Sequence, residues 1–279
     1  LVKTDSNGNE QWNQIYDLSI TSYGESIQLT SDGGYIFVGS SPNPSGVGGH
    51  DLRLVKIDIN GNEEWNQTYG WDGSEFGESI QQTSDGGYII TGFSNSYDPA
   101  CDLWLIKTDS NGNQEWNQMY GGINSEFGKS VKQTSDGGYI ITGYTNSFGN
   151  GSDDLWLIKT DPSGNEEWNQ TYGGYDRDRG YSIEQTFDAG YIICGYTGET
   201  NNFEDQGSNL WLIKIQAPPP LGDVNQDGQI DIVDVVTVIQ IVLNIYEPNE
   251  TEEYISDYNS DGSIDVSDVI LIIGYILEN

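Results

Sequence analysis

Basic residues are scarce in this chain. Only 10 of its 279 residues are Lys or Arg, against 44 Asp and Glu, and the formal net charge is −34. Such an acidic surface repels nucleic acid and anionic membranes, so we expect neither as a partner. It favours solubility and suits cations. From Gln216 to the C-terminus there is no Lys or Arg at all, although 13 Asp and Glu residues lie there.

Long apolar runs, cysteine and histidine are also rare. No run of about 20 apolar residues occurs, so no segment is predicted to be inserted in a membrane. Two cysteines, Cys101 and Cys194, do not make a disulfide framework, and we expect free, partly buried thiols. The only histidine, His50, lies in a Gly-rich loop with no cysteine nearby, so no catalytic residue is predicted.

One unit is repeated through the first 216 residues. The Trp of "EQWNQ", "EEWNQ", "QEWNQ" and "EEWNQ" recurs at Trp12, Trp65, Trp116 and Trp168, in steps of 53, 51 and 52 residues. Each unit predicts four short strands, exemplified by "GESIQQT", "YIITGYT", "DLWLIKTD" and "EEWNQTY". The turns "SDGG" and "SNGN" separate them, because Gly and Asn adopt positive φ easily.

Four antiparallel strands in about 50 residues, repeated in tandem, are typical of a propeller blade. We therefore predict an all-β propeller of ~52-residue four-stranded blades over residues 1–216, with four repeats plus one extra strand. The repeating Trp is expected to wedge between neighbouring blades. The repeats resemble the β-propeller repeats of secreted archaeal and bacterial surface proteins over residues 1–215, which implies a fold rather than an activity.

The count of strands leaves the ring unresolved. The "LIK" strand occurs five times and each other strand four times. In the usual closure, "EQWNQIY" completes the last blade, which leaves Leu1–Asp5 spare. The alternatives are a larger ring whose upstream blades are missing from a trimmed chain, or pairing of the spare strand with another copy.

The last 58 residues carry a different pattern. After a Pro-rich linker at residues 217–221, "DVNQDGQIDIVD" (223–234) places Asp or Asn at alternate positions, and "DYNSDGSIDVSD" (257–268) repeats this 34 residues later. The spacing is that of EF-hand loops, with ligands at positions 1, 3, 5, 7, 9 and 12 and Gly at 6. Each loop leads into a predicted apolar helix, at residues 233–244 and 266–279, and no helix is predicted ahead of either loop.

Two bound calcium ions are the predicted cofactors, because calcium prefers hard oxygen ligands. Four carboxylates in each loop repel one another, so folding and calcium binding should be coupled. Gln229 and Ser263 would bind through their carbonyls. The predicted ligands are Asp223, Asn225, Asp227, Gln229, Asp231 and Asp234 in the first loop, and Asp257, Asn259, Asp261, Ser263, Asp265 and Asp268 in the second.

These loops and helices resemble a type I dockerin domain over residues 222–277, so a small α-helical, calcium-binding, dockerin-like domain is expected at 222–279. The resemblance implies two halves related by a pseudo-twofold axis and a cohesin domain as partner. Loop positions 10 and 11, which help set cohesin choice in that family, are Ile232–Val233 and Val266–Ser267. The family commonly has a Ser–Thr pair there, so the class of partner is open.

The expected function is that of an extracellular or cell-surface, calcium-dependent structural or adhesive protein. The propeller would be an interaction platform, and the tail would attach it to a cohesin-like protein, the cell surface or another copy, as in a filament or surface layer. A tail that caps its own propeller would instead predict a monomer. Sequons at Asn66, Asn150, Asn169 and Asn249 are candidate glycosylation sites.

A dockerin-bearing carbohydrate-active enzyme or carbohydrate-binding module is the alternative. Paired carboxylates in the variable loops would serve a glycosidase, and aromatic side chains there would stack on glycans. The candidate acids are Asp72, Glu75, Glu126, Asp176 and Asp178, and the candidate aromatic residues are Trp71, Phe76, Phe127 and Tyr175.

Overall fold

The computed structural model describes residues 1–16, 22–43, 49–96, 100–199, 207–216, 221–226, 229–259 and 261–278. The chain divides into two compact units, Leu1–Ile215 and Gln216–Asn279. The described part of the first unit consists of strands and that of the second of helices. The chain is therefore mostly β, followed by a small helical region.

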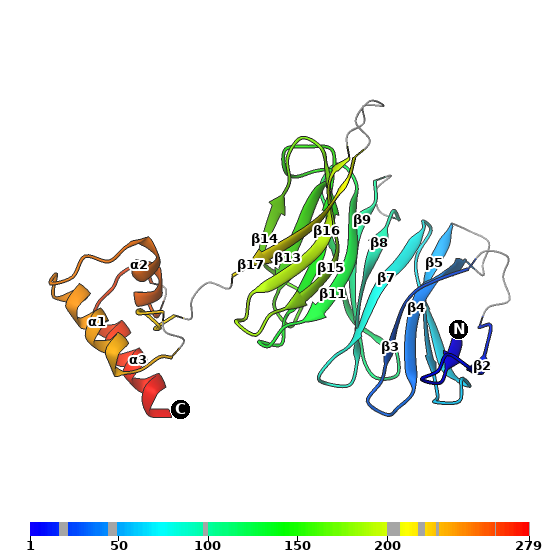
Figure 1. Ribbon diagram of the computed structural model, residues 1–279, viewed down its shortest axis with the longest axis horizontal. Helices are drawn as coiled ribbons and strands as arrows, with labels where there is room; N and C mark the ends of the chain where they lie inside the picture. Colours follow the sequence, from blue (N-terminus) through cyan, green and yellow to red (C-terminus); the bar gives the residue numbers. More distant parts are fainter. Residues whose placement is uncertain are drawn as a thin grey trace. The chain divides into compact units, whose positions relative to one another are not determined.

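In the described part of the first unit, five antiparallel sheets of two to four strands lie in a row that follows the chain (Figure 1). Each four-stranded sheet pairs its strands in sequence order. The sheets are β1 (Val2–Thr4) and β2 (Glu10–Asn13); β3 (Tyr23–Leu29), β4 (Tyr35–Pro42), β5 (His50–Ile57) and β6 (Glu63–Tyr69); β7 (Glu75–Gln82), β8 (Tyr88–Ser94), β9 (Asp102–Thr108) and β10 (Gln114–Tyr120); β11 (Glu126–Gln133), β12 (Tyr139–Thr145), β13 (Asp154–Thr160) and β14 (Glu166–Tyr172); and β15 (Arg177–Gln185), β16 (Tyr191–Glu199) and β17 (Asn209–Ile215).

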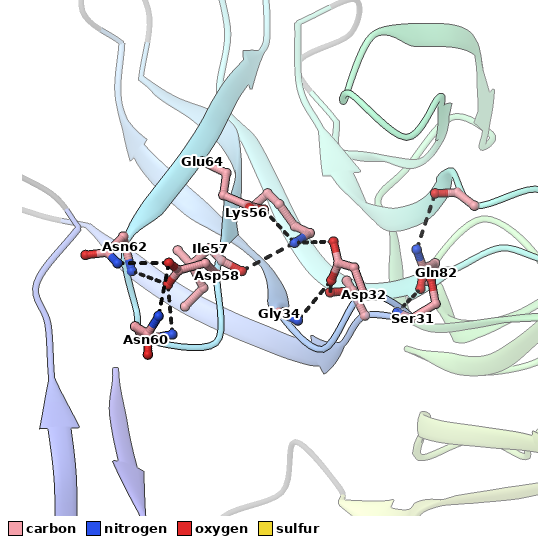
Figure 2. Close-up of polar contacts among 12 residues, drawn as sticks. Ser31, Asp32, Gly34, Lys56, Ile57, Asp58, Asn60, Asn62, Glu64 and Gln82 are labelled. Carbon is pink, nitrogen blue, oxygen red and sulfur yellow. Dashed lines mark hydrogen bonds and ion pairs between the residues drawn. The ribbon is translucent and has the colours of Figure 1, made fainter.

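An ion-paired lysine ties strands together in each four-stranded sheet, and Figure 2 shows it for the sheet of β3–β6. Lys56 of β5, whose side chain is 4% exposed, contacts Asp32 at 2.9 Å and Glu64 at 2.7 Å. Asp32 also accepts hydrogen bonds from Thr30 and Gly34, and the bonds from Thr30 and Lys56 lower its pKa to about 2. The buried charge is thus matched on both sides of β5. The same arrangement recurs at Lys107 and Lys159.

The four larger sheets stack face to face, and each of their three interfaces has an apolar core. Residues of β4, β5, β7 and β8 form the first core, and equivalent strands form the second and third. The ring of Trp65 lies against the hairpin turn of the next sheet, where a Cβ on Gly112 would be 2.7 Å from it, and Trp116 lies equally close to Gly164. The Trp side chains therefore pack between neighbouring sheets.

The N-terminal strand is not spare. Val2–Thr4 (β1) pairs with Glu10–Asn13 (β2), so the predicted pairing of "EQWNQIY" with the last sheet is wrong for this structure. The reason is local: Asp5 accepts the backbone N–H groups of Asn7 and Asn9 and closes a short hairpin, which costs less chain entropy than a long-range closure. In the described part of the chain the last sheet has three strands, and no closed ring is formed.

The described residues of the second unit form three helices: α1 (Ile232–Val242), α2 (Glu250–Ser256) and α3 (Val266–Glu278). Val235 and Val238 of α1 and Ile272 of α3 are buried in its core. Helix α2 directly precedes the second loop, so the expectation of no helix there is wrong. Asn249 begins it with a capping box, a signal present in "NETE". None of the described helices is long and apolar enough to cross a membrane.

Candidate functional site

The two acidic loops fold alike around their last carboxylate. Asp234 is fully buried and accepts the backbone N–H groups of Asn225 (3.0 Å) and Asp231 (2.9 Å), loop positions 3 and 9. Asp268, also fully buried, accepts those of Asn259 (3.1 Å) and Asp265 (2.9 Å). Each position-12 carboxylate therefore fixes its loop to the first turn of the following helix. The two halves share one local geometry.

The remaining predicted ligands of the second loop are turned toward its backbone. Asp257 accepts the N–H groups of Asp261 (3.1 Å) and Gly262 (2.8 Å), and Gly262 has φ 85°. Asp261 accepts the N–H of Ser263 at 2.9 Å. The backbone N–H of Ser267 lowers the pKa of the Asp265 carboxyl. In the first loop, Asp231 caps α1, whereas Asp227 lies outside the described residues.

The donor set of both loops fits calcium. Their side-chain donors are Asp and Asn oxygens, which suit a hard cation. Asp234 and Asp268 are fully buried, and no Lys or Arg occurs from residue 216 onward to neutralise them. A buried carboxylate without a compensating charge is costly, and a divalent cation would supply that charge. Among the described residues no three acidic side chains already surround one point, so the individual ligands remain predictions.

A double apolar stripe lies beside these loops on α1 and α3. Both helices carry exposed aliphatic residues at the same spacing of four, three and four positions, with the last residue of the α1 stripe, Leu243, at the C-cap of that helix. The four partner-binding candidates Ile232, Val233, Val266 and Ser267 are all exposed, at the N-terminal end of the stripes. The exposed fractions are 63, 47, 38 and 61% for Ile232, Val236, Ile239 and Leu243, and 60, 63, 37 and 81% for Val266, Ile270, Ile273 and Leu277.

Apolar residues thus occur on both sides of α1 and α3. One side of each helix packs into the core of the unit, and the stripe lies on the other. A helix apolar all round is normally buried, and a large exposed apolar patch marks an interaction surface. We name the eight exposed aliphatic residues of the two stripes, which begin at Ile232 and Val266, the stripe face. Sequence reasoning identified only its first residues, although the helical period of the others could have revealed them.

Three of the candidate acids in the first unit are buried at equivalent repeat positions. Glu75 and Glu126 are fully buried and Asp178 is 2% exposed. Glu126 accepts hydrogen bonds from Thr145 (2.9 Å) and Gly122 (2.8 Å), and Asp178 accepts one from Gly174 (2.8 Å). Asp72 is exposed and Asp176 half-buried.

Each of these buried acids has a second carboxylate close to it. Oxygens of Asp51 and Glu75 lie 2.4 and 2.6 Å from the point that a Cβ on Gly70 would occupy, and Gly121 and Gly173 show the same arrangement. Burial, followed by the charge of Glu75, raises the pKa of the Asp51 carboxyl. These pairs lie between consecutive sheets, where only glycine leaves them room.

Three of the four aromatic candidates pack against other rings, and the fourth, Tyr175, is exposed. Phe76 and Phe127 belong to a row of ring contacts across the sheets: Phe76 stacks on Phe93 at 4.9 Å, and Phe93 contacts Phe127 edge to face at 4.8 Å. Trp71 packs on Trp104 at 4.9 Å. Tyr175 is 91% exposed. The four sequon asparagines are also exposed, Cys101 and Cys194 are free and half-buried, and Asn249 additionally caps α2.

Comparison with known proteins identifies the second unit. The dockerin type I domain family matches residues 221–277. No curated protein matches the chain.

Among solved structures, this chain is similar to a protein of unknown function from Bacteroides caccae. That likeness has 13% identity, covers 77% of this chain and 68% of the other, and has a TM-score of 0.47. A candidate exo-β-1,3-galactanase from Bifidobacterium bifidum is 12% identical, with 70% and 68% coverage and a TM-score of 0.38. Residues 221–277 form a dockerin type I domain, a family that typically binds calcium and attaches extracellular or cell-surface proteins to cohesin-bearing scaffolds.

Proposed function

We propose that this protein is an extracellular attachment protein whose dockerin unit holds two calcium ions and binds a cohesin-type partner through the stripe face. The stacked sheets are the rigid platform that this unit anchors. The observation that carries the proposal is the duplication of loop geometry and exposed stripe in the two halves. An adhesive or structural role for the platform follows from its repeated, stacked architecture.

Calcium would act by neutralising the loops. The ion would supply positive charge to carboxylates that have no basic partner within their own unit. Asp234 and Asp268 transmit the state of each loop to its helix, because each joins loop backbone to the first turn of that helix. Without the ion, buried carboxylates repel one another, and we expect the helices to lose their packing.

The chemistry of the stripe face indicates an apolar partner surface. Its eight residues are aliphatic, so burial rather than ion pairing would supply most of the affinity. Binding should therefore weaken little with salt. Because the stripe occurs twice, either half can serve as the main contact, and both must be disrupted to abolish binding.

Immobilised type I cohesins test the proposal. The full chain should bind at least one of a panel in calcium and none in excess chelator. The double variant Ile232→Asp/Val266→Asp should bind at least 100-fold more weakly, while each single variant changes affinity less. Tyr254→Asp, on α2 and 55% exposed, is the matched control and should bind normally. Failure of the whole panel, or normal binding by the double variant, would refute the proposal.

We further propose that the platform binds rather than catalyses. Three of the five candidate acids support this, because they are buried between sheets at equivalent repeat positions. One of them, Asp178, accepts a hydrogen bond from the loop backbone at Gly174. Release of reducing sugar from a polysaccharide panel by the calcium-loaded chain is the measurement that would favour the enzyme instead.

A further inference from the structure

All three interfaces between the four larger sheets use the same contact. An aliphatic residue on the first strand of one sheet packs against two leucines of the third strand of the preceding sheet. Ile183 of β15, fully buried, shares a core with Leu155 and Leu157 of β13. Val131 and Ile80 occupy the equivalent positions in the other two interfaces, against Leu103 with Leu105 and Leu52 with Leu54.

Close approach at these interfaces depends on glycine. Three residues before the aliphatic residue, a Cβ on Gly180 would lie 2.3 Å from Thr142 Oγ1 and 3.1 Å from Leu155 Cγ. Gly77 and Gly128 meet the same crowding. The interface is therefore defined by a Gly and an aliphatic residue on one side, and two leucines on the other.

The first four-stranded sheet carries one half of this interface on the side that faces the N-terminus, where only the two short strands β1 and β2 precede it in the described part of the chain. Gly24 and Ile27 of β3 are the equivalent residues, and Ile27 is 51% exposed. No described atom lies within 4 Å of a Cβ placed on Gly24. A recess of about 250 Å³, lined in part by Ile15, Tyr23 and Phe37, lies beside them. We name Gly24, Ile27 and this recess the front face.

The back of the last sheet carries the other half. Leu210 and Leu212 of β17 are 84% and 64% exposed, whereas their equivalents Leu155 and Leu157 are fully buried. Cys194 is opposite Leu212 in the ladder, as Thr142 is opposite Leu157. The register is therefore the same. We name Leu210, Leu212 and Cys194 the back face.

We infer that the front face of one copy of this chain binds the back face of another, head to tail. Figure 1 shows the first and last sheets at opposite ends of the row, so one chain does not bring its own two faces together. The contact would continue the interface already used three times within each chain. Because the two faces differ, the contact can repeat from copy to copy.

The edge strands fit the same contact between copies, which we name the joint. The fourth strand is missing from the last sheet in the described part of the chain, and β2 is a fourth strand whose partner is the short β1. In the joint, β17 of one copy takes the place of β1 beside the other copy's β2. The β1–β2 ladder has three residue pairs, against six between β9 and β10, so the exchange gains paired backbone.

Charge does not oppose the joint at its centre. Within the chain, Glu78 of β7 forms an ion pair (2.5 Å) with Lys129 at the equivalent position of β11, the first strand of the next sheet. At the joint these positions hold Tyr181 and Glu25, so like charges do not face each other there. The net charge of −34 repels whole copies, and assembly should therefore strengthen with salt.

Light scattering by the full chain tests this inference. The mass should rise above the 30.8 kDa of one copy as protein concentration increases, more so at high salt, and equally in calcium and in chelator. Ile27→Asp and Leu212→Asp should each reduce the mass to that of one copy. Ile123→Asp, 88% exposed and away from both faces, should assemble like the wild type.

Mixing the two variants gives the decisive readout. The intact back face of the Ile27→Asp chain can bind the intact front face of the Leu212→Asp chain, so an equimolar mixture should form a dimer and nothing larger. A wild type that stays monomeric, a mixture that stays monomeric, or association that vanishes in chelator would overturn the inference. The last result would place association in the dockerin unit, and cohesin binding tests that unit separately.

Discussion

The free energy of unfolding that is lost when one aliphatic side chain is shortened should depend on where its repeat lies in the row of sheets. Ile183 and Ile27 occupy equivalent positions on first strands, but Ile183 is fully buried and Ile27 is 51% exposed. Ile183→Ala removes three carbon groups, worth roughly 2.4 kcal/mol of transfer free energy, and leaves a cavity that adds to this. We expect a loss of about 3 kcal/mol in the free energy of unfolding.

For Ile27→Ala the transfer term is about halved and no closed cavity forms, so a loss of about 1 kcal/mol is expected. Urea unfolding followed by Trp fluorescence, at protein concentrations low enough to keep the chain monomeric, measures both values. Because stacked repeats are stabilised mainly by their neighbours, Ile183→Ala should also separate the unfolding of the last sheet from that of the others. Equal losses in the two variants would refute the stacked arrangement.

Three more predictions concern the first unit. Tyr120 donates its buried hydroxyl to the Gly164 carbonyl, so Tyr120→Phe should cost about 1–2 kcal/mol in thermal or urea unfolding, whereas Tyr172→Phe, which loses an exposed bond, should cost almost nothing. Burial raises the pKa of Asp85, but its hydrogen bonds from lysine and threonine outweigh this and lower it to about 2; its contribution to stability is therefore present above pH 4 and lost as the pH falls toward 2, which acid titration of the melting temperature checks. In a host that glycosylates asparagine, mass spectrometry should find glycan on the exposed Asn169 and none in Asn169→Gln.

Much of the architecture could be predicted from the sequence because it is fixed by local chemistry. The turn glycines and the period of about 52 residues give the strands of each sheet. The alternating acids predict calcium-binding loops, and the loop residues and apolar runs together indicate a dockerin unit. In both cases neighbouring residues contain the whole signal.

The remaining features depend on long-range contacts, which a local sequence pattern does not reveal. The stretch from Glu10 to Asn13 has the same fourth-strand sequence whether it pairs with β1 or with the last sheet, and only the free energy of the two pairings differs. Helix α2 has seven residues, too few for a periodic apolar face. Burial of Glu75 follows from stacking of one sheet on the next, which its place in a loop-like stretch does not reveal.

The most direct measurement for the attachment function is a calcium titration of the full chain, by calorimetry and far-ultraviolet circular dichroism together. The account predicts two ions bound per chain, with a helical signal that appears on loading and disappears in excess chelator while the signal of the sheets is unchanged. Binding of fewer than two ions, or a helical signal indifferent to calcium, would contradict it.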